Sequence, residues 1–452
     1  MTVQDPATAT LGAPVRSDPH PGWLRAVLHA AYDAAWILAA LLSTPWLLYR
    51  SLVSPGFFAM ATQRLGFGLP KLDPPAEGVT RVLVHGVSVG EIKAAVPVVR
   101  QLLAREERVE VVVSSTTDSG TELARKLFAD LVVVRFPIDI APLVSRFLRR
   151  LEPDCVVLLE LEIWPNFLRG ANRRGISVAV VNGRITEKSY SRYRRFRQLL
   201  PQHDRISLFC VQEERYAERF RRLSIDPARI VVTGNVKADG LRLGRAQAPA
   251  ELSELLGGAR DQMIGVAGST HEPEELELVR AWLAAESESR LVLVPRHPER
   301  ADSIVRRLAQ EGVETQRLSE LRRGSLRPDP GLPVLVDTIG ELEQVYALAD
   351  WAFVGGSLIP HGGQNILEPA AQGIPVLFGP SMENFAHEAE LLLRHGAAIQ
   401  VGGVEELVES LRRLERDRAF LRGMAEAGAR AVESQQGATA RTLDYFARVC
   451  LA

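Results

Sequence analysis

Three acidic residues follow apolar, strand-like runs, and they are the first candidates for chemistry. Glu91 closes a glycine-containing turn that also holds Ser88 and Gly90, while Glu160 and Glu162 end another run. Residues two apart point to the same face of an extended chain. An acid buried there is costly unless it binds a ligand or joins a hydrogen-bonded network. A carboxylate so placed could deprotonate a hydroxyl as a general base.

Structural alternatives exist for each of these acids. Glu91 could be only a first-turn residue that the helix dipole stabilises by ~0.3–1 kcal/mol. Glu160 and Glu162 could be a buried, hydrogen-bonded pair that serves the fold. The sequence leaves both alternatives open.

A second group of residues is suited to binding phosphate. Arg296 and His297 follow an apolar run, and a guanidinium fits phosphate or carboxylate groups. Ser269 and Thr270 also leave a strand-like run. Pro273 and the acids beside it mark a helix start, so a capping role competes there with ligand binding.

Two glycine pairs make up the most informative pattern. Gly355, Gly356 and Ser357 end an apolar run, and a second glycine pair precedes Asn365 and Glu368. Exposed amides at a helix start bind phosphate, and a nearby carboxylate can accept ribose hydroxyls. The pattern is typical of the nucleotide-sugar half of a two-domain, doubly wound glycosyltransferase.

No pattern in the chain calls for a metal or a cofactor. Neither GxGxxG nor the P-loop pattern occurs, and no Asp-x-Asp element stands in a plausible metal position. We therefore expect a helix dipole and basic side chains to neutralise the leaving phosphate. No metal and no cofactor are expected.

The elements that position these residues form two series of βαβ units. Short β-branched runs alternate with helical patterns, which predicts parallel sheets with helices on both faces. The first series of expected strands is 81–85, 109–114, 131–134, 155–160, 177–181, 207–211 and 229–233. The second series is 262–268, 290–295, 333–337, 351–356 and 375–379.

The expected fold class is α/β, with two doubly wound Rossmann-like domains and an N-terminal hydrophobic anchor helix. Ligands in such folds bind in a cleft at the carboxyl ends of the strands. The expected segments are a disordered leader over 1–22, a membrane anchor over 23–50, a first Rossmann-like domain over 51–240, a second over 241–452, and a linker within 236–250.

Residues 34–49 form a run of sixteen residues without charge, and Trp36, Trp46 and Tyr49 lie in it. The run is shorter than the ~20 residues of a straightforward span. Its extension to Trp23 takes in charged and polar residues, which are costly in hydrocarbon. We interpret it as a membrane anchor, either a short span or an interfacial helix. A core helix and a cleaved signal peptide are the alternatives.

Composition and charge narrow the class of protein. The 452 residues are 46% hydrophobic and 24% charged, as in globular proteins. A net charge of -1 gives no reason to expect nucleic acid binding. Cys155, Cys210 and Cys450 stand far apart in no metal-binding or disulfide pattern, which indicates inert thiols in a reducing compartment.

One region is strongly basic. Residues 141–222 hold 17 Lys and Arg against 9 Asp and Glu. Within the segment 188–197, Tyr190, Tyr193 and Phe196 recur every third position, and most of the other residues are basic. The basic residues that we single out there are Lys188, Arg192, Arg194 and Arg195. This pattern is typical of a helix on an anionic surface, and a solvated helix is the alternative.

The chain resembles the transferases of 3-deoxy-D-manno-octulosonic acid (Kdo) that build the inner core of lipopolysaccharide. The resemblance covers about residues 50–435 and rests on ordered blocks. These blocks are HGVSVGE, TTDSG, LELEIWPN, VTGNVK, GSTHEPEE, LVPRHPER, DTIGELEQVY, AFVGGSL and GGQNILEPAA.

The resemblance implies transfer of Kdo from CMP-Kdo to a lipid A precursor, at the cytoplasmic face of the inner membrane and in contact with its lipid. It implies that Glu91 is the general base, that the configuration inverts, and that Glu162 or Glu160 supports the site. The acceptor would contact the turn of Ser88 and Gly90, and the basic helix described above.

The resemblance also implies how the donor is bound. Lys237 and Arg296, with His297 beside it, would face the donor phosphate or the Kdo carboxylate. Ser269 and Thr270 would lie near the CMP phosphate, with the Gly355–Ser357 turn. Asn365 and Glu368 would hold the nucleotide, Glu368 at the ribose.

Two positions depart from the family pattern. Gln364 replaces the usual His and cannot carry a charge, and Gly183 replaces the usual Ala. Two rival functions stay open at this point. One is a membrane-associated glycosyltransferase of the same fold with a different nucleotide sugar, and the other is a non-catalytic nucleotide-binding protein of the envelope.

Overall fold

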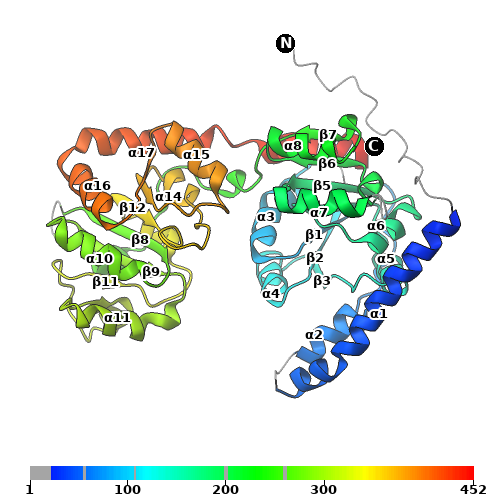
Figure 1. Cartoon of the computed structure of the whole chain (residues 1–452), viewed down its shortest axis with the longest axis horizontal. Coiled ribbons are helices and arrows are strands. Elements are labelled where there is room, and N and C mark those ends of the chain that lie inside the picture. The colour runs from blue at the N-terminus through cyan, green and yellow to red at the C-terminus, as the bar shows by residue number, and fades with distance from the viewer. Residues whose placement is uncertain (1–21, 54–56, 106–107, 198–201, 258–261, 452) are drawn as a thin grey trace, which may run out of the picture. The chain divides into compact units, whose positions relative to one another are not determined.

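The computed structural model describes residues 22–53, 57–105, 108–197, 202–257 and 262–451. The chain divides into two compact units (Figure 1). The first comprises the chain up to Gly240 together with 436–452, and the second is Leu241–Gln435. Apart from its last residue, the expected leader over 1–22 lies outside the described residues.

A seven-stranded parallel sheet forms the centre of the first unit. Its strand order is β3-β2-β1-β4-β5-β6-β7. The strands are β1 (Thr80–Gly86), β2 (Val109–Ser115), β3 (Val132–Arg135), β4 (Cys155–Leu159), β5 (Ser177–Gly183), β6 (Leu208–Val211) and β7 (Ile230–Val232). The helices between them are α3 (Val89–Leu103), α4 (Asp118–Leu127), α5 (Ala141–Leu151), α6 (Pro165–Asn172), α7 (Glu187–Arg197) and α8 (Glu214–Arg222).

The second unit repeats this plan with its own parallel sheet. Its order is β10-β11-β9-β8-β12-β13-β14. The strands are β8 (Ile264–Thr270), β9 (Arg290–Pro295), β10 (Gln316–Arg317), β11 (Val334–Leu335), β12 (Trp351–Val354), β13 (Val376–Phe378) and β14 (Ala398–Gln400). The helices are α9 (Ala250–Leu256), α10 (Glu274–Ala284), α11 (Ala301–Gln310), α12 (Leu318–Arg322), α13 (Leu342–Tyr346), α14 (Leu367–Ala371), α15 (Ala386–Arg394), α16 (Val404–Arg416) and α17 (Arg418–Glu433).

Both faces of each sheet are buried, which explains why the strands are apolar throughout. In β1, Leu83 belongs to one core cluster and its neighbours Val82 and Val84 to the opposite one. Helices cover the two faces, so alternate side chains both leave water. The predicted fold class, two doubly wound α/β units, is confirmed. Strands β10 and β14 are additional to those expected.

The C-terminal segment belongs to the first unit, whereas residues 241–452 were expected to form one domain. Helix α18 (Ala438–Phe446) buries Leu443 and Phe446 in the same core cluster as Val82. The Asp239 carboxylate accepts hydrogen bonds from the amides of Gly437 and Thr439. A short π-helical turn, Ala447–Leu451, follows α18.

All three cysteines are buried in the first unit. The Cys155 thiol donates to the backbone carbonyl of Cys450. Burial raises the pKa of the Cys210 thiol to about 12. Thiols held in this way are not activated as nucleophiles.

Two N-terminal helices contact each other and project from the first unit (Figure 1). They are α1 (Gly22–Val53) and α2 (Phe57–Arg64). Residues Ala26–Trp46 are long and apolar enough to cross a membrane by length and composition. The exposed apolar side chains include Leu41, Leu42 and Trp46, at 65%, 74% and 55% exposure.

Candidate active site

Glu91 is held in a capping arrangement at the start of α3. Its carboxylate accepts hydrogen bonds from the Val87 amide at 2.7 Å and from the Ser88 hydroxyl at 2.9 Å. The Ser88 hydroxyl in turn accepts from the Glu91 amide at 3.3 Å. This reciprocal pattern stabilises the helix start. The structural alternative raised for Glu91 therefore describes part of its role, and the side chain is only 8% exposed.

The turn before α3 leaves little room at one glycine and ample room at another. A Cβ at Gly86 would lie 3.1 Å from the Glu91 Cβ. A Cβ at Gly90 would meet no atom closer than 3.8 Å, and Gly90 is exposed. The protein itself therefore does not require a glycine at position 90.

Glu160 and Glu162 lie beyond the end of β4, which pairs with β1. Glu160 has a left-handed backbone (φ 61°) and its amide donates to Val181 O. The Lys237 ammonium donates to the Glu160 carboxylate at 2.7 Å. The two carboxylates and Glu91 come together because the carboxyl ends of adjacent parallel strands meet at one edge of the sheet.

Burial and nearby charge raise the pKa values of two of these acids. Burial is the main cause that raises the pKa of Glu162 to about 8, and the charges of Glu91 and Glu160 add to it. Burial also raises the pKa of Glu91, with a further contribution from the charge of Glu160, and the hydrogen bond from Val87 opposes this rise. At neutral pH Glu162 is therefore mostly protonated, and its carboxyl group can donate a hydrogen bond.

A pocket of about 320 Å³ opens beside Glu160 and Glu162. It extends to the start of α7, where the Ser189 amide donates to the Thr186 hydroxyl. The remaining lining residues are Leu161, Arg184, Ser189, Arg192 and Tyr193. Of the basic residues predicted to meet the acceptor, Arg192 lines this pocket.

Helix α7 presents its basic residues outward. Lys188, Arg192, Arg194 and Arg195 are exposed, whereas Tyr190 is buried. The guanidinium of Arg194 lies 5.8 Å from the centre of the Tyr190 ring. The outward arrangement fits both the anionic-surface interpretation and the solvated-helix alternative.

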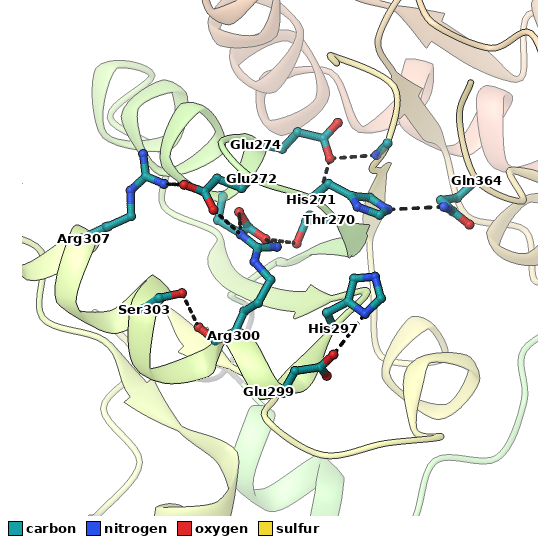
Figure 2. A network of polar contacts seen from close by, with 12 residues as sticks. Thr270, His271, Glu272, Glu274, His297, Glu299, Arg300, Ser303, Arg307 and Gln364 are labelled. Atoms are coloured by element: carbon teal, nitrogen blue, oxygen red, sulfur yellow. Dashed lines mark hydrogen bonds and ion pairs between the residues drawn. The ribbon is translucent and has the colours of Figure 1, made fainter. Parts of the chain in front are cut away.

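In the second unit, a buried carboxylate organises the glycine turn after β12. Glu274 is fully buried and accepts hydrogen bonds from Gly356, Ser357 and Leu358 amides at 2.7, 2.9 and 3.0 Å. It also accepts from the amide of His271 at 2.8 Å, a contact drawn in Figure 2. These turn amides are therefore already bonded within the protein.

A second acid links the ends of β8 and β9. The Thr270 hydroxyl donates to the Glu275 carboxylate at 3.0 Å, and the Arg300 guanidinium donates to it at 3.1 and 3.3 Å. Thr270 is fully buried. Its hydroxyl thus belongs to an internal network, while Ser269, with φ of 54°, is only half-buried.

Three histidines gather beside the glycine turn. The His271 ring lies 4.2 Å from that of His361 and 5.8 Å from that of His297, measured between ring centres. Gln364 contacts the His271 ring nitrogen at 3.3 Å (Figure 2). Burial, then the charges of His361 and His297, lower the pKa of His271 to about 4. This ring is neutral at physiological pH.

The remaining residues predicted to bind the sugar donor differ in their exposure and in their hydrogen bonds. Arg296 and His297 are exposed, and the His297 ring contacts Glu299 at 3.2 Å. Ser357 is buried, and its hydroxyl donates to Val354 O at 2.6 Å and accepts from Gly379 N at 2.8 Å.

Asn365 and Glu368 lie, like the glycine turn, at the edge of the second sheet where its strands end. The Asn365 amide donates to the Glu368 carboxylate at 3.1 Å. Gly355 packs against the end of β8, because a Cβ there would lie 2.5 Å from the Thr270 Cα.

Lys237, predicted to face the donor, lies in the first unit with Glu160.

Several of these residues could not be identified from the sequence. Glu274 gives no signal beyond an acid at a helix start, and three of its amide partners, those of Gly356, Ser357 and Leu358, lie more than 80 positions away. The neighbouring rings of His271 and His361 come from separate segments. Among the described residues, no group of three or more His, Cys, Asp or Glu side chains is arranged to hold a metal ion.

Comparison with known proteins agrees with this architecture. Residues 60–240 match the family model described as 3-deoxy-D-manno-octulosonic-acid transferase. The solved UDP-GlcNAc 2-epimerase from Neisseria meningitidis bound to UDP-GlcNAc is similar in fold, with a TM-score of 0.56 over 81% of this chain and 99% of that one. At 16% identity this likeness concerns the fold alone.

Curated relatives are similar over most of the sequence. The 3-deoxy-D-manno-octulosonic acid transferase of Haemophilus influenzae is 31% identical over 410 residues, covering 88% of this chain and 92% of that protein. The transferase of the same name from Bordetella pertussis is 32% identical, covering 84% and 89%. The chain therefore belongs to the 3-deoxy-D-manno-octulosonic acid (Kdo) transferase family.

Proposed function

We propose that this protein transfers Kdo from CMP-Kdo to a hydroxyl of a lipid A precursor, with inversion and without a metal ion. The reaction belongs to the synthesis of the lipopolysaccharide inner core, at the cytoplasmic face of the inner membrane. Family membership supports the transferred sugar. The observation that carries the chemistry is the cluster of Glu91, Glu160 and Glu162, in which burial and mutual repulsion raise the pKa values of Glu91 and Glu162.

Glu91 acts as the general base in this proposal. Its carboxylate takes the proton of the acceptor hydroxyl while that oxygen forms a bond to the anomeric carbon of Kdo. The bond from this carbon to the CMP phosphate breaks, and its electron pair leaves with CMP. A raised pKa makes Glu91 a stronger base than an exposed glutamate once it is ionised.

Glu162 and Glu160 support the base in different ways. Protonated Glu162 donates a hydrogen bond to the acceptor sugar or to Glu91. Glu160 is held in place by Lys237, whose ammonium donates to its carboxylate at 2.7 Å. The basic side chains at the neighbouring pocket, Arg184 and Arg192, suit the negative charge that a phosphorylated acceptor carries.

The second unit holds the donor in this proposal. The exposed Arg296 faces the phosphate or the Kdo carboxylate, beside His297 and Ser269. Asn365 and Glu368, already hydrogen-bonded to each other, hold the nucleotide, with Glu368 at the ribose. Because Glu274 occupies the turn amides, we assign Gly355–Ser357 a shaping role around the donor rather than direct amide contacts to phosphate.

A transfer assay tests the proposal. Purified protein is given freshly generated CMP-Kdo and a tetra-acylated lipid A precursor, and products are analysed by mass spectrometry, with CMP and UDP as competitors. Added Kdo masses, with inhibition by CMP but not by UDP, are expected. Inhibition by UDP alone would favour a different nucleotide sugar, and binding of CMP without any product would favour a non-catalytic protein.

A further inference from the structure

Helices α1 and α2 together form an N-terminal hairpin. Polar groups of α1 bond the first of these helices to the first unit. The Tyr32 hydroxyl donates to the Asp139 carboxylate at 3.0 Å. Asp33 accepts from the Asn166 side-chain amide at 2.6 Å and from the Ala141 amide at 3.2 Å. Asp33, which would be costly in hydrocarbon, is thus used in contacts with the protein. This part of α1 lies against the domain.

Helix α2 is bonded to the end of β3 and to the loop that follows it. Residues 136–140 form this loop, which joins β3 to α5 and contains Asp139. The Arg135 guanidinium donates to the Gln63 side chain at 3.0 Å, and the Ile138 amide donates to Arg64 O at 3.2 Å. The chain therefore leaves this loop near residue 33 and returns to it near residue 63.

The segment between these two attachments carries the exposed apolar surface. Seven apolar side chains of α1 are between 50% and 74% exposed: Ile37, Leu38, Leu41, Leu42, Trp46, Tyr49 and Val53. Residues 34–49 contain no charged side chain. Tryptophan and tyrosine favour the membrane interface, so a lipid bilayer is the partner that this surface fits.

We propose that the α1–α2 hairpin enters one leaflet and returns without crossing the bilayer. A segment whose ends meet at one loop crosses a membrane an even number of times. Two crossings need roughly 40 apolar residues, more than residues 34–62 provide. The number of crossings is therefore zero, and the N-terminus lies on the same side of the membrane as the two α/β units.

This inference rests on the membrane association proposed above, and cysteine labelling separates the two. The three native cysteines are buried, so the wild-type protein is the unlabelled control. Ser17→Cys reports the leader, Ser325→Cys reports an exposed position of the second unit, and Leu42→Cys reports the hairpin. Each variant of the full chain is treated with a membrane-impermeant maleimide in sealed inside-out and right-side-out vesicles.

We expect Ser17→Cys and Ser325→Cys to be labelled in the same vesicle orientation, and Leu42→Cys to be labelled only after detergent is added. Labelling of Ser17→Cys only in the opposite orientation would show a crossing and overturn the inference. Labelling of Leu42→Cys without detergent in membrane-bound protein would also overturn it. Protein that fails to sediment with the vesicles would refute membrane association itself.

Discussion

Replacement of Glu162 by Gln should stabilise the first unit in a pH-dependent manner. Glutamine keeps the shape and hydrogen-bonding ability of a protonated glutamate but cannot ionise. Glu162 has its pKa raised from 4.5 to about 8 by burial and by the charges of Glu91 and Glu160. The wild-type protein must therefore accommodate an unfavourable charge at high pH, and the Glu162→Gln protein need not.

The expected size and sign follow from proton linkage. Below about pH 4.5 both folded and unfolded states hold the proton, so the variant gains nothing. Between that pH and about pH 8 the unfolded chain releases the proton while the folded protein keeps it, so wild-type stability falls relative to the variant. At ~1.4 kcal/mol per pKa unit the limit is about 5 kcal/mol. Because Glu162 is partly exposed, we expect about 2–4 kcal/mol.

Urea unfolding of both proteins at about pH 5, 7 and 9 measures this difference. The matched control is Glu122→Gln, whose carboxylate is 71% exposed and should show almost no pH-dependent difference. A free energy of unfolding that changes with pH equally in wild type and Glu162→Gln would refute the reasoning. It would mean that Glu162 ionises at its ordinary pKa in the folded protein.

Three further substitutions test other parts of the account. Gly90→Ala should fold normally, because its Cβ meets no atom within 3.8 Å, yet lower transfer if a ligand approaches this turn; full activity would exclude that approach. Gly356→Val should weaken CMP binding, since a Cβ would lie 3.1 Å from His361, and an unchanged Kd would contradict this. Asp139→Asn should lower the free energy of unfolding by ~2 kcal/mol, because its carboxylate accepts from Tyr32, Asn166 and Phe167; equal stability in urea would refute it.

The sequence identified Glu91, Glu160 and Glu162 as candidates because each of them follows an apolar, strand-like run. Only the family resemblance placed them in one site, because neither segment shows by itself that β1 pairs with β4. The same reasoning identified nearly all the strands. Strands β10 and β14 were not predicted, because two or three residues are too few to show a periodic pattern.

Other features could not be read from the chain because their partners are distant in sequence. Helix α18 is amphipathic, but nothing in its own residues says that it packs on the first unit. Glu274 looks like an ordinary acid at a helix start, and only the folded sheet brings it to the glycine turn after β12. Asp33 is unfavourable for an anchor in the sequence alone, and its partner Asn166 becomes visible only in the structure.

The central claim is that Glu91 deprotonates the acceptor. The most direct test measures Kdo transfer from CMP-Kdo to the lipid A precursor by wild type, Glu91→Gln and the exposed control Glu122→Gln, with CMP binding and unfolding measured on the same samples. Removing a general base typically costs ~10²–10⁴-fold in rate. We expect such a loss in Glu91→Gln alone, with CMP binding retained. Wild-type turnover by a folded Glu91→Gln protein would contradict it.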